Sequence, residues 1–268
     1  MNKTIWINWF QGWDNSPEIT HKCVESWKYY NPEWNIVLLS NDNYSQYADF
    51  EEKIPGINTN NIDKSDILRI SLLANHGGVW ADSTLFCNKP LDSWIHDYED
   101  YFVFTRADNI MDNWFMMAQG DRYIAKRMYQ MTIDYWKGRI AKGNQEELIW
   151  CWQISFLRNL LSSDQRTKDI IGSWDHLDCA HDVYNRQKGH GWRGRGVHFF
   201  TPYYQFFYEP VTEEFKNRID AKIDPVYKLT YKEQTDWKPE GGYHPDNRKI
   251  MLNYPEDSQL WYLLNTVL

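Results

Sequence analysis

The stretch from residue 65 to 86, SDILRISLLANHGGVWADSTLF, combines acidic, basic and glycine residues at spacings that could serve chemistry. Asp66 and Arg69 stand three residues apart on a predicted helix, so both side chains point to one face of it. Asp82 follows an apolar Val-Trp-Ala segment and is expected at a strand end, where open α/β sheets bind their ligands. The stretch therefore predicts a site with two carboxylates and one guanidinium.

These groups suit a ligand whose diphosphate is the leaving group of a reaction. The diphosphate gains negative charge as its bond to a sugar breaks, and a divalent metal ion can stabilise that charge. Mg²⁺ and Mn²⁺ prefer oxygen ligands and often use one or two protein carboxylates beside phosphates and water. A nearby arginine can pair with a phosphate or hold the aspartate. Taken singly, Asp66 and Arg69 would favour a surface ion pair, and Asp82 could be a turn aspartate.

The elements that must position these residues alternate at the start of the chain. Residues 3–9 predict a strand, and a helix is expected to start with Ser16 as N-cap and Pro17 at the first helical position. Residues 35–39 predict a second strand. This order is typical of an α/β fold with a doubly wound sheet.

The catalytic stretch itself is expected to contain a helix at residues 63–75, which Gly77 and Gly78 close with a tight turn. The other predicted elements are strands at 79–80, 101–105 and 113–117 and helices at 122–137 and 146–161. The last helix lacks the Lys-rich polar face of membrane-surface helices, so it is interpreted as a core helix. A single domain over residues 1–268 is the simplest organisation, because no linker or repeat interrupts the chain.

Composition narrows the class of protein further. The 268 residues suffice for one large α/β domain, and they include 15 Trp and 18 Tyr. Aromatic rings stack on sugars and nucleobases, although they equally fill protein cores. The net charge of −8 argues against a duplex nucleic-acid partner.

Cysteines and hydropathy indicate the compartment. The four cysteines lie far apart in the sequence, which argues against a thiolate zinc site and fits reduced thiols. The first residues lack the long apolar stretch of a signal peptide, so none is expected, and the sequence contains no run of eighteen apolar residues. A cytoplasmic protein is expected, with docking at the inner face of a membrane left open.

The joined pattern S-D-x-x-R, L-L and G-G-V-W-A-D-S-T resembles the DxD-containing glycosyltransferases of family 32, and their capsular polysaccharide synthesis branch above all. Large clostridial toxins that glucosylate host proteins carry a similar block. The start of the chain, from Ile5 to Pro32, and Lys228-Leu229-Thr230 near its end also resemble that branch. The middle of the chain matches only loosely.

The resemblance implies a retaining hexosyltransferase of GT-A type, in which a Rossmann-like nucleotide-binding sheet is flanked by helices. Residues 1–120 would be the nucleotide-sugar-binding half. Residues 121–268 would form a mainly helical acceptor-side region and a closing C-terminal segment.

The resemblance also assigns roles to single residues. Trp6 would stack on the nucleobase, and Gly78 would lie in the donor-binding segment. Asp66 and Arg69 would hold the donor sugar, while Asp82 would contact the ribose and the metal. Together these three charged residues would form the catalytic set.

This chain departs from the DxD pattern at Thr84, which stands in place of the second aspartate. Threonine is a weaker, neutral ligand for Mn²⁺ or Mg²⁺. A metal site formed by Asp82 and Thr84 is expected, and a metal-independent enzyme remains an alternative.

Basic residues elsewhere could meet the diphosphate. The segment 186–196, RQKGHGWRGRG, is glycine-rich and cationic, so Lys188, Arg193 or Arg195 could close over the phosphates. The alternative is a plain surface loop. Lys228 is a second candidate phosphate contact, implied by the resemblance alone.

The resemblance favours UDP-galactose or UDP-glucose as donor and a lipid-linked oligosaccharide as acceptor, in capsular or surface polysaccharide synthesis. A glycoside hydrolase is one alternative, although no pair of acids stands out for it. A non-catalytic protein that binds nucleotide sugars or carbohydrates is another. A toxin-like protein glucosyltransferase is a third, against which the absence of a delivery segment argues.

Overall fold

The computed structural model describes residues 2–106, 111–145, 152–172, 178–181, 196–198, 210–229, 232–234, 248–250 and 255–265. The chain forms two compact units whose segments interleave along the sequence. Unit 1 comprises residues 1–15, 33–82 and 95–176, and unit 2 comprises residues 16–32, 83–94 and 177–268. The predicted halves at 1–120 and 121–268 have other bounds than these units, and their functional meaning stays a prediction.

Unit 1 contains a mixed sheet. Its strands are β1 (Thr4–Asn8), β2 (Asn35–Leu39), β3 (Gly78–Ala81), β5 (Tyr101–Arg106) and β6 (Met111–Ala118). Strand β1 runs parallel to both β2 and β3, as in a Rossmann-like sheet, whereas β6 runs antiparallel to both β3 and β5. The predicted α/β class is thus confirmed, with an antiparallel extension beyond the parallel strands.

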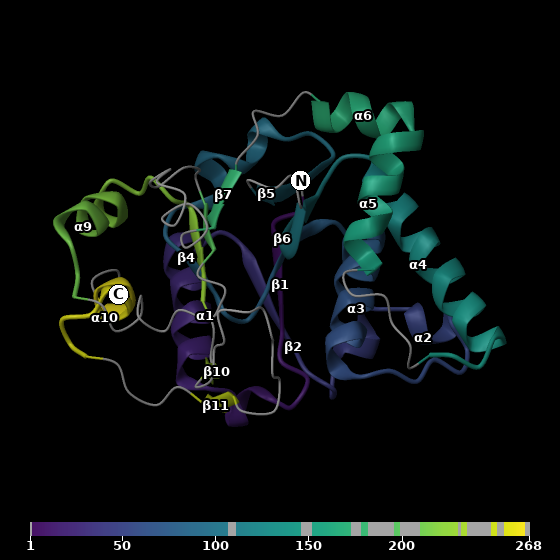
Figure 1. Ribbon diagram of the computed structural model, residues 1–268, viewed down its shortest axis with the longest axis horizontal. Coiled ribbons are helices and arrows are strands. Elements are labelled where there is room, and N and C mark those ends of the chain that lie inside the picture. Colours follow the sequence, from purple (N-terminus) through teal and green to yellow (C-terminus); the bar gives the residue numbers. More distant parts are fainter. Residues whose placement is uncertain are drawn as a thin grey trace, which may run out of the picture. The chain divides into compact units, whose positions relative to one another are not determined.

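Helices cover this sheet. The long ones are α3 (Asn61–Asn75), α4 (Tyr123–Ala141) and α5 (Trp152–Ser163), which lie side by side (Figure 1), and α6 (Gln165–Gly172) follows α5. Short helical turns are η1 (Trp13–Asn15), η2 (Tyr44–Gln46), α2 (Phe50–Lys53) and η4 (Ile95–Asp97). The strand β1 is buried along its whole length, as expected for a parallel strand inside a covered sheet.

Helix α3 begins two residues earlier than predicted because Asn60 caps it. The Asn60 side chain accepts hydrogen bonds from the backbone N–H groups of Ile62 and Asp63 at 2.8 and 3.0 Å. The helix ends at Asn75, as the sequence predicted.

Two glycines make the connection from α3 to β3 tight. Gly77 and Gly78 have φ angles of +74° and +89°, a region that other residues rarely adopt. A Cβ atom on Gly78 would lie 2.4 Å from the carbonyl oxygen of Thr4 in β1. Glycine at 78 therefore allows β3 to start directly against β1, and Asp82 follows four residues later.

Unit 2 contains a smaller sheet and helix α1 (Glu18–Tyr30). Strands β7 (Asp178–His181), β8 (Gly196–His198) and β9 (Val226–Lys228) pair in parallel, and β4 (Leu85–Cys87) pairs antiparallel to β9. Strands β10 (Lys232–Gln234) and β11 (Arg248–Ile250) form a separate pair. The remaining elements are η3 (Leu91–Ser93), α9 (Glu213–Asp220) and α10 (Gln259–Asn265).

The described part of residues 121–268 is mainly helical, as predicted, because α4, α5, α6, α9 and α10 hold most of its residues in regular elements. Five strands, β7 to β11, lie there beside the helices. Each strand is only three or four residues long, so it shows too little alternation of polar and apolar residues to be recognised in the sequence.

Helix α1 starts one residue later than predicted. Pro17, not Ser16, occupies the N-cap position, with an extended ψ of 146° and no side-chain cap. The Ser16 hydroxyl instead accepts a hydrogen bond from the Thr20 hydroxyl at 2.9 Å.

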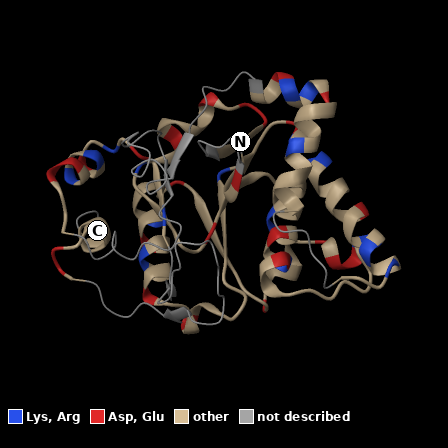
Figure 2. Ribbon diagram, viewed as in Figure 1, with Lys and Arg blue, Asp and Glu red and all other residues tan. Residues whose placement is uncertain are grey.

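Helices α1 and α9 each carry both acidic and basic residues rather than charge of one sign (Figure 2).

Helix α1 packs on β4 through buried polar contacts. The indole N–H of Trp27 donates to the carbonyl of Leu85 at 2.7 Å, and the Ser26 hydroxyl accepts from the backbone N–H of Cys87 at 2.8 Å. Cys23 and Cys87 are buried free thiols, and burial raises the pKa of the Cys87 thiol to about 12.

Among the described residues, no helix has both the length and the apolar character that crossing a membrane requires.

Candidate functional site

Asp66 and Arg69 form the ion pair that their spacing on α3 predicted. One guanidinium nitrogen, Nη1, lies 3.0 Å from Oδ1 of Asp66, and the two side chains are 7% (Arg69) and 16% (Asp66) exposed. The alternative of a surface ion pair is thus wrong, because the arginine is buried. The guanidinium also lies over the ring of Trp80 in β3, 5.3 Å from its centroid.

Asp82 joins this pair from the carboxyl end of β3. Its Oδ1 accepts a hydrogen bond from the indole N–H of Trp80 at 2.9 Å and lies 3.5 Å from Nη2 of Arg69. Its backbone N–H donates to the carbonyl of Trp114 in β6 at 2.9 Å. The structure therefore gathers the three predicted charged residues into one group, the Asp66–Arg69–Asp82 cluster. The Asp82 side chain is 24% exposed, so a ligand can reach it.

Two residues that the sequence analysis missed complete the cluster. Asn113 in β6 accepts from Arg69 Nη1 through its carbonyl at 2.9 Å, and its side-chain amide donates to Asp66 Oδ1 at 3.2 Å. Gln153 in α5 donates to the carbonyl of Asp66 at 2.6 Å and accepts from Asn113 at 3.2 Å. These residues lie 47 and 87 positions from Asp66, so no local sequence signal points to them.

Burial shapes the electrostatics of the cluster. Burial is the main cause that raises the pKa of Asp66; Arg69 opposes it, the carboxylates of Asp82 and Asp63 add to it, and the net pKa is about 6. Two carboxylates around one guanidinium leave the cluster with more negative than positive charge when both are ionised. It is thus suited to bind hydroxyl donors or cationic groups of a ligand.

The raised pKa predicts how stability depends on pH. Between about pH 4 and 6 the folded protein holds a proton on Asp66 that the unfolded chain releases, so stability falls as pH rises through this window. Replacing Asp66 with Asn should remove this loss. Between pH 4 and 7, we expect the free energy of unfolding of the wild type to fall by on the order of 2 kcal/mol relative to that of Asp66→Asn. Urea unfolding measures both values.

Asp49 offers a control of opposite sign. Burial disfavours its charge, but hydrogen bonds from Tyr129, Lys53 and Asn75 outweigh burial and lower its pKa to about 2. Its contribution is present above the unfolded pKa near 4 and disappears only as pH falls toward 2. The stability difference between wild type and Asp49→Asn should therefore stay constant from pH 5 to 7. If the Asp66→Asn difference is equally constant, the pKa of Asp66 is not raised.

Trp6 lies in the middle of β1 and is only 4% exposed. Its indole N–H donates to the carbonyl of Gly77 at 2.9 Å, and its ring contacts Tyr47 and His76. Trp9, just beyond the carboxyl end of β1, is only half-buried. Because ligands bind at this end of parallel strands, Trp9 is the better placed ring for a nucleobase. The stacking role of either ring stays a prediction.

Thr84 and Lys228, both in unit 2, contact each other. The Lys228 ammonium donates to the Thr84 hydroxyl oxygen at 2.7 Å. A divalent cation bound to that oxygen would meet the ammonium at about 4 Å, and their repulsion is on the order of 8 kcal/mol at an effective dielectric constant near 20. Thr84 therefore does not fit its predicted role as a metal ligand. Among the described residues, no three acidic, His or Cys side chains form a metal-binding group either.

The cationic segment at 186–196 lies outside the described residues, except for Gly196 at the start of β8. The predicted phosphate contacts of Lys188, Arg193 and Arg195 therefore stay predictions. Cys151 likewise lies outside the described residues.

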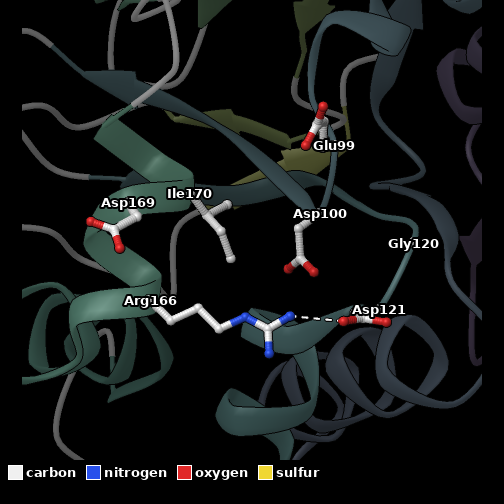
Figure 3. A pocket seen from close by; sticks show the side chains of 7 residues that line it. All are labelled: Glu99, Asp100, Gly120, Asp121, Arg166, Asp169 and Ile170. Atoms are coloured by element: carbon white, nitrogen blue, oxygen red, sulfur yellow. Dashed lines mark hydrogen bonds and ion pairs between the residues drawn. The ribbon is translucent and has the colours of Figure 1, made fainter.

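A cavity of about 530 Å³ opens in unit 1, at the other end of the sheet from the cluster. Its walls are Glu99, Asp100, Gly120, Asp121, Arg166, Asp169 and Ile170 (Figure 3). The cavity residues that follow β6 lie at the end of the sheet where Ala118 pairs with Gly78, the first residue of β3. Asp82 follows Ala81, the last residue of β3, and so lies at the opposite end. Four carboxylates and one guanidinium make this cavity unsuited to a diphosphate.

Comparison with known proteins places the chain in a family. Residues 1–144, more than half of the chain, match the capsular polysaccharide synthesis proteins. The chain belongs to this family. The resemblance read from the S-D-x-x-R and G-G-V-W-A-D segments is confirmed at this level. All three residues of the Asp66–Arg69–Asp82 cluster lie within the matched range.

Two O-glycosyltransferases are similar in sequence to this capsular polysaccharide synthesis family member. The O-glycosyltransferase braB of Annulohypoxylon truncatum is 26% identical over 51% of this chain and 38% of its own length. The O-glycosyltransferase PaGT of Phomopsis amygdali is 21% identical over 72% of this chain and 56% of its own length. This chain thus spans about half or less of these relatives. Among solved structures, the PaToxG glycosyltransferase aligns with 83% of this chain and 85% of its own, at 12% identity and a TM-score of 0.44.

Proposed function

We propose that this protein is a retaining GT-A glycosyltransferase that moves a hexose from a UDP-sugar to a carbohydrate acceptor. The observation that carries the proposal is the Asp66–Arg69–Asp82 cluster, which lies at the carboxyl end of β3. Membership in the capsular polysaccharide synthesis family and the two relatives named as O-glycosyltransferases support it.

In this proposal the cluster binds the donor by its hydroxyl groups. Asp66 accepts hydrogen bonds from the hexose, and Asp82 accepts them from the ribose. Arg69 keeps both carboxylates in place, since it contacts each of them. A half-buried carboxylate holds a hydroxyl donor strongly because little water competes for it.

The reaction exchanges one bond to the anomeric carbon for another. The bond to the β-phosphate oxygen breaks and its electron pair leaves with UDP, while the acceptor oxygen bonds to the same carbon on the same face. The acceptor proton passes to the leaving phosphate. The protein contributes by positioning the two substrates and by electrostatic stabilisation. The expectation of Mn²⁺ or Mg²⁺ is not part of this proposal, because Thr84 does not fit as a ligand.

The acceptor we propose is an oligosaccharide of a capsular or surface polysaccharide, carried on a lipid. UDP-galactose and UDP-glucose are the proposed donors. The cytoplasmic location, at the inner face of the membrane, stays a prediction.

A donor screen tests the proposal. We expect UDP-sugars, and neither GDP- nor CMP-sugars, to raise the melting temperature, because a ligand that binds only the folded state stabilises it. UDP-galactose or UDP-glucose should then be consumed slowly with water and faster with an oligosaccharide acceptor. The anomeric configuration of the product, read by NMR, tests retention.

Other outcomes would replace the proposal. Stabilisation by UDP-sugars without any product would indicate a non-catalytic binding protein. Cleavage of an oligosaccharide in the absence of any donor would indicate a glycoside hydrolase. No response to any nucleotide sugar would contradict the proposed donor class.

A further inference from the structure

Thr84 stands where the resembling glycosyltransferases have the second aspartate of their motif, and unit 2 gives it a cationic partner. The Lys228 ammonium donates to the Thr84 hydroxyl at 2.7 Å. The two residues are 5% (Thr84) and 8% (Lys228) exposed. A buried ammonium thus lies on the side chain that would otherwise hold a metal ion.

The backbone fixes this contact as well. Strands β4 and β9 pair antiparallel, with Leu85 opposite Lys228. The backbone N–H of Leu229 donates to the carbonyl of Thr84 at 2.8 Å. Thr84 therefore accepts two hydrogen bonds from the end of β9 and the residue after it: its carbonyl accepts from Leu229 and its hydroxyl from Lys228. The ammonium is held in place before any ligand arrives, so little side-chain entropy is left to lose on binding.

The chemistry of the pair matches an anion better than a cation. An ammonium carries three N–H donors, and the bond to Thr84 orients them. Threonine can hold an ammonium in this way because its hydroxyl oxygen accepts a hydrogen bond without adding charge. An aspartate at 84 would neutralise the lysine, whereas Thr84 brings no negative charge to the pair.

We propose that the Lys228 ammonium, seated on Thr84, takes the place of the divalent cation at this position and binds a phosphate of a nucleoside diphosphate without metal. The proposal rests on the proposed function, since it assumes a nucleoside diphosphate donor. A charge-assisted N–H···O bond to phosphate is strong, and lysine binds phosphate in many proteins as a point charge.

The first test measures binding of UDP and GDP to the full chain by calorimetry, in EDTA and in excess Mn²⁺. We expect the Kd of the nucleotide that binds to change less than threefold between the two buffers. Lys228→Met should weaken binding at least tenfold in both buffers. Circular dichroism should show that the variant is folded.

Lys222 provides a matched control. Its ammonium also donates to a neutral hydroxyl in unit 2, that of Tyr30 at 2.6 Å, but it lies outside the motif. Lys222→Met removes the same charge from the protein and should bind the nucleotide as the wild type does. Equal weakening by Lys222→Met and Lys228→Met would mean that only net charge matters, which overturns the proposal.

A double variant tests the exchange of lysine for metal directly. Thr84→Asp combined with Lys228→Met restores the aspartate and removes the ammonium, so nucleotide binding should become at least tenfold tighter in Mn²⁺ than in EDTA. If the wild type itself needs Mn²⁺ to that extent, the lysine does not replace the metal, while the proposed function stands. If the wild type binds neither nucleotide in either buffer, both proposals fail.

Discussion

Asp82→Asn is expected to lower the rate of hexose transfer by a factor of about 100 or more while the protein stays folded. Asparagine keeps the side-chain oxygen that accepts from Trp80 and faces Arg69, so the contacts that hold the residue survive. It loses the negative charge and replaces the second oxygen by an amide donor. A ligand hydroxyl that donated to the carboxylate then meets a weaker acceptor.

Initial rates of UDP release, with acceptor and saturating UDP-sugar, measure this effect, and circular dichroism measures stability. Trp80→Phe should cost less, about tenfold, because it removes the N–H that fixes Asp82 but keeps both the ring and the carboxylate. Asp121→Asn removes an exposed carboxylate whose partner is Arg166, and its rate should equal that of the wild type. Turnover of Asp82→Asn within threefold of the wild type would remove Asp82 from the catalytic set.

The cluster was predictable where its geometry is local. Asp66 and Arg69 lie on one helix at a spacing that brings their side chains together. The helix, its end just before Gly77 and the following strand all have clear sequence signals. The strand places Asp82 at its carboxyl end. Three residues of the site follow from these local rules.

The contacts made across the sheet were not predictable. Asn113 contacts Asp66 only because β6 pairs with β3 in one particular register. Gln153 belongs to α5, which packs on β6. Thr84 and Lys228 are 144 residues apart. Their contact depends on the pairing of two three-residue strands, which are too short for a pattern to reveal. The sequence showed the departure from the motif, but only the fold shows the ammonium that accompanies it.

Gly78→Ala is expected to cause the largest loss of stability of any substitution considered, about 3 kcal/mol or more. Two effects add at this position. The φ angle of +89° strains any residue with a Cβ atom, and the new Cβ would lie 2.4 Å from the carbonyl oxygen of Thr4. Since that oxygen belongs to the neighbouring strand β1, the clash is with backbone and no side-chain rotation relieves it.

Gly56→Ala separates the two effects. Gly56 has a similar φ of +79°, but a Cβ atom there would meet nothing within 4 Å. The free energy of unfolding of Gly56→Ala should therefore fall only by the cost of the positive φ angle, about 1 kcal/mol, in urea unfolding at pH 7. The difference between the two variants measures the contact with β1. If Gly78→Ala loses no more than Gly56→Ala, the close approach of β3 to β1 does not constrain residue 78.

The same pair of variants connects the fold to the site. Any shift of β3 away from β1 moves Asp82, because only Val79, Trp80 and Ala81 separate it from Gly78. At a temperature where both variants are folded, Gly78→Ala should bind the UDP-sugar more weakly than the wild type, whereas Gly56→Ala should bind it equally well. Equal binding by all three proteins would show that β1 and β3 can separate at residue 78 without displacing the cluster.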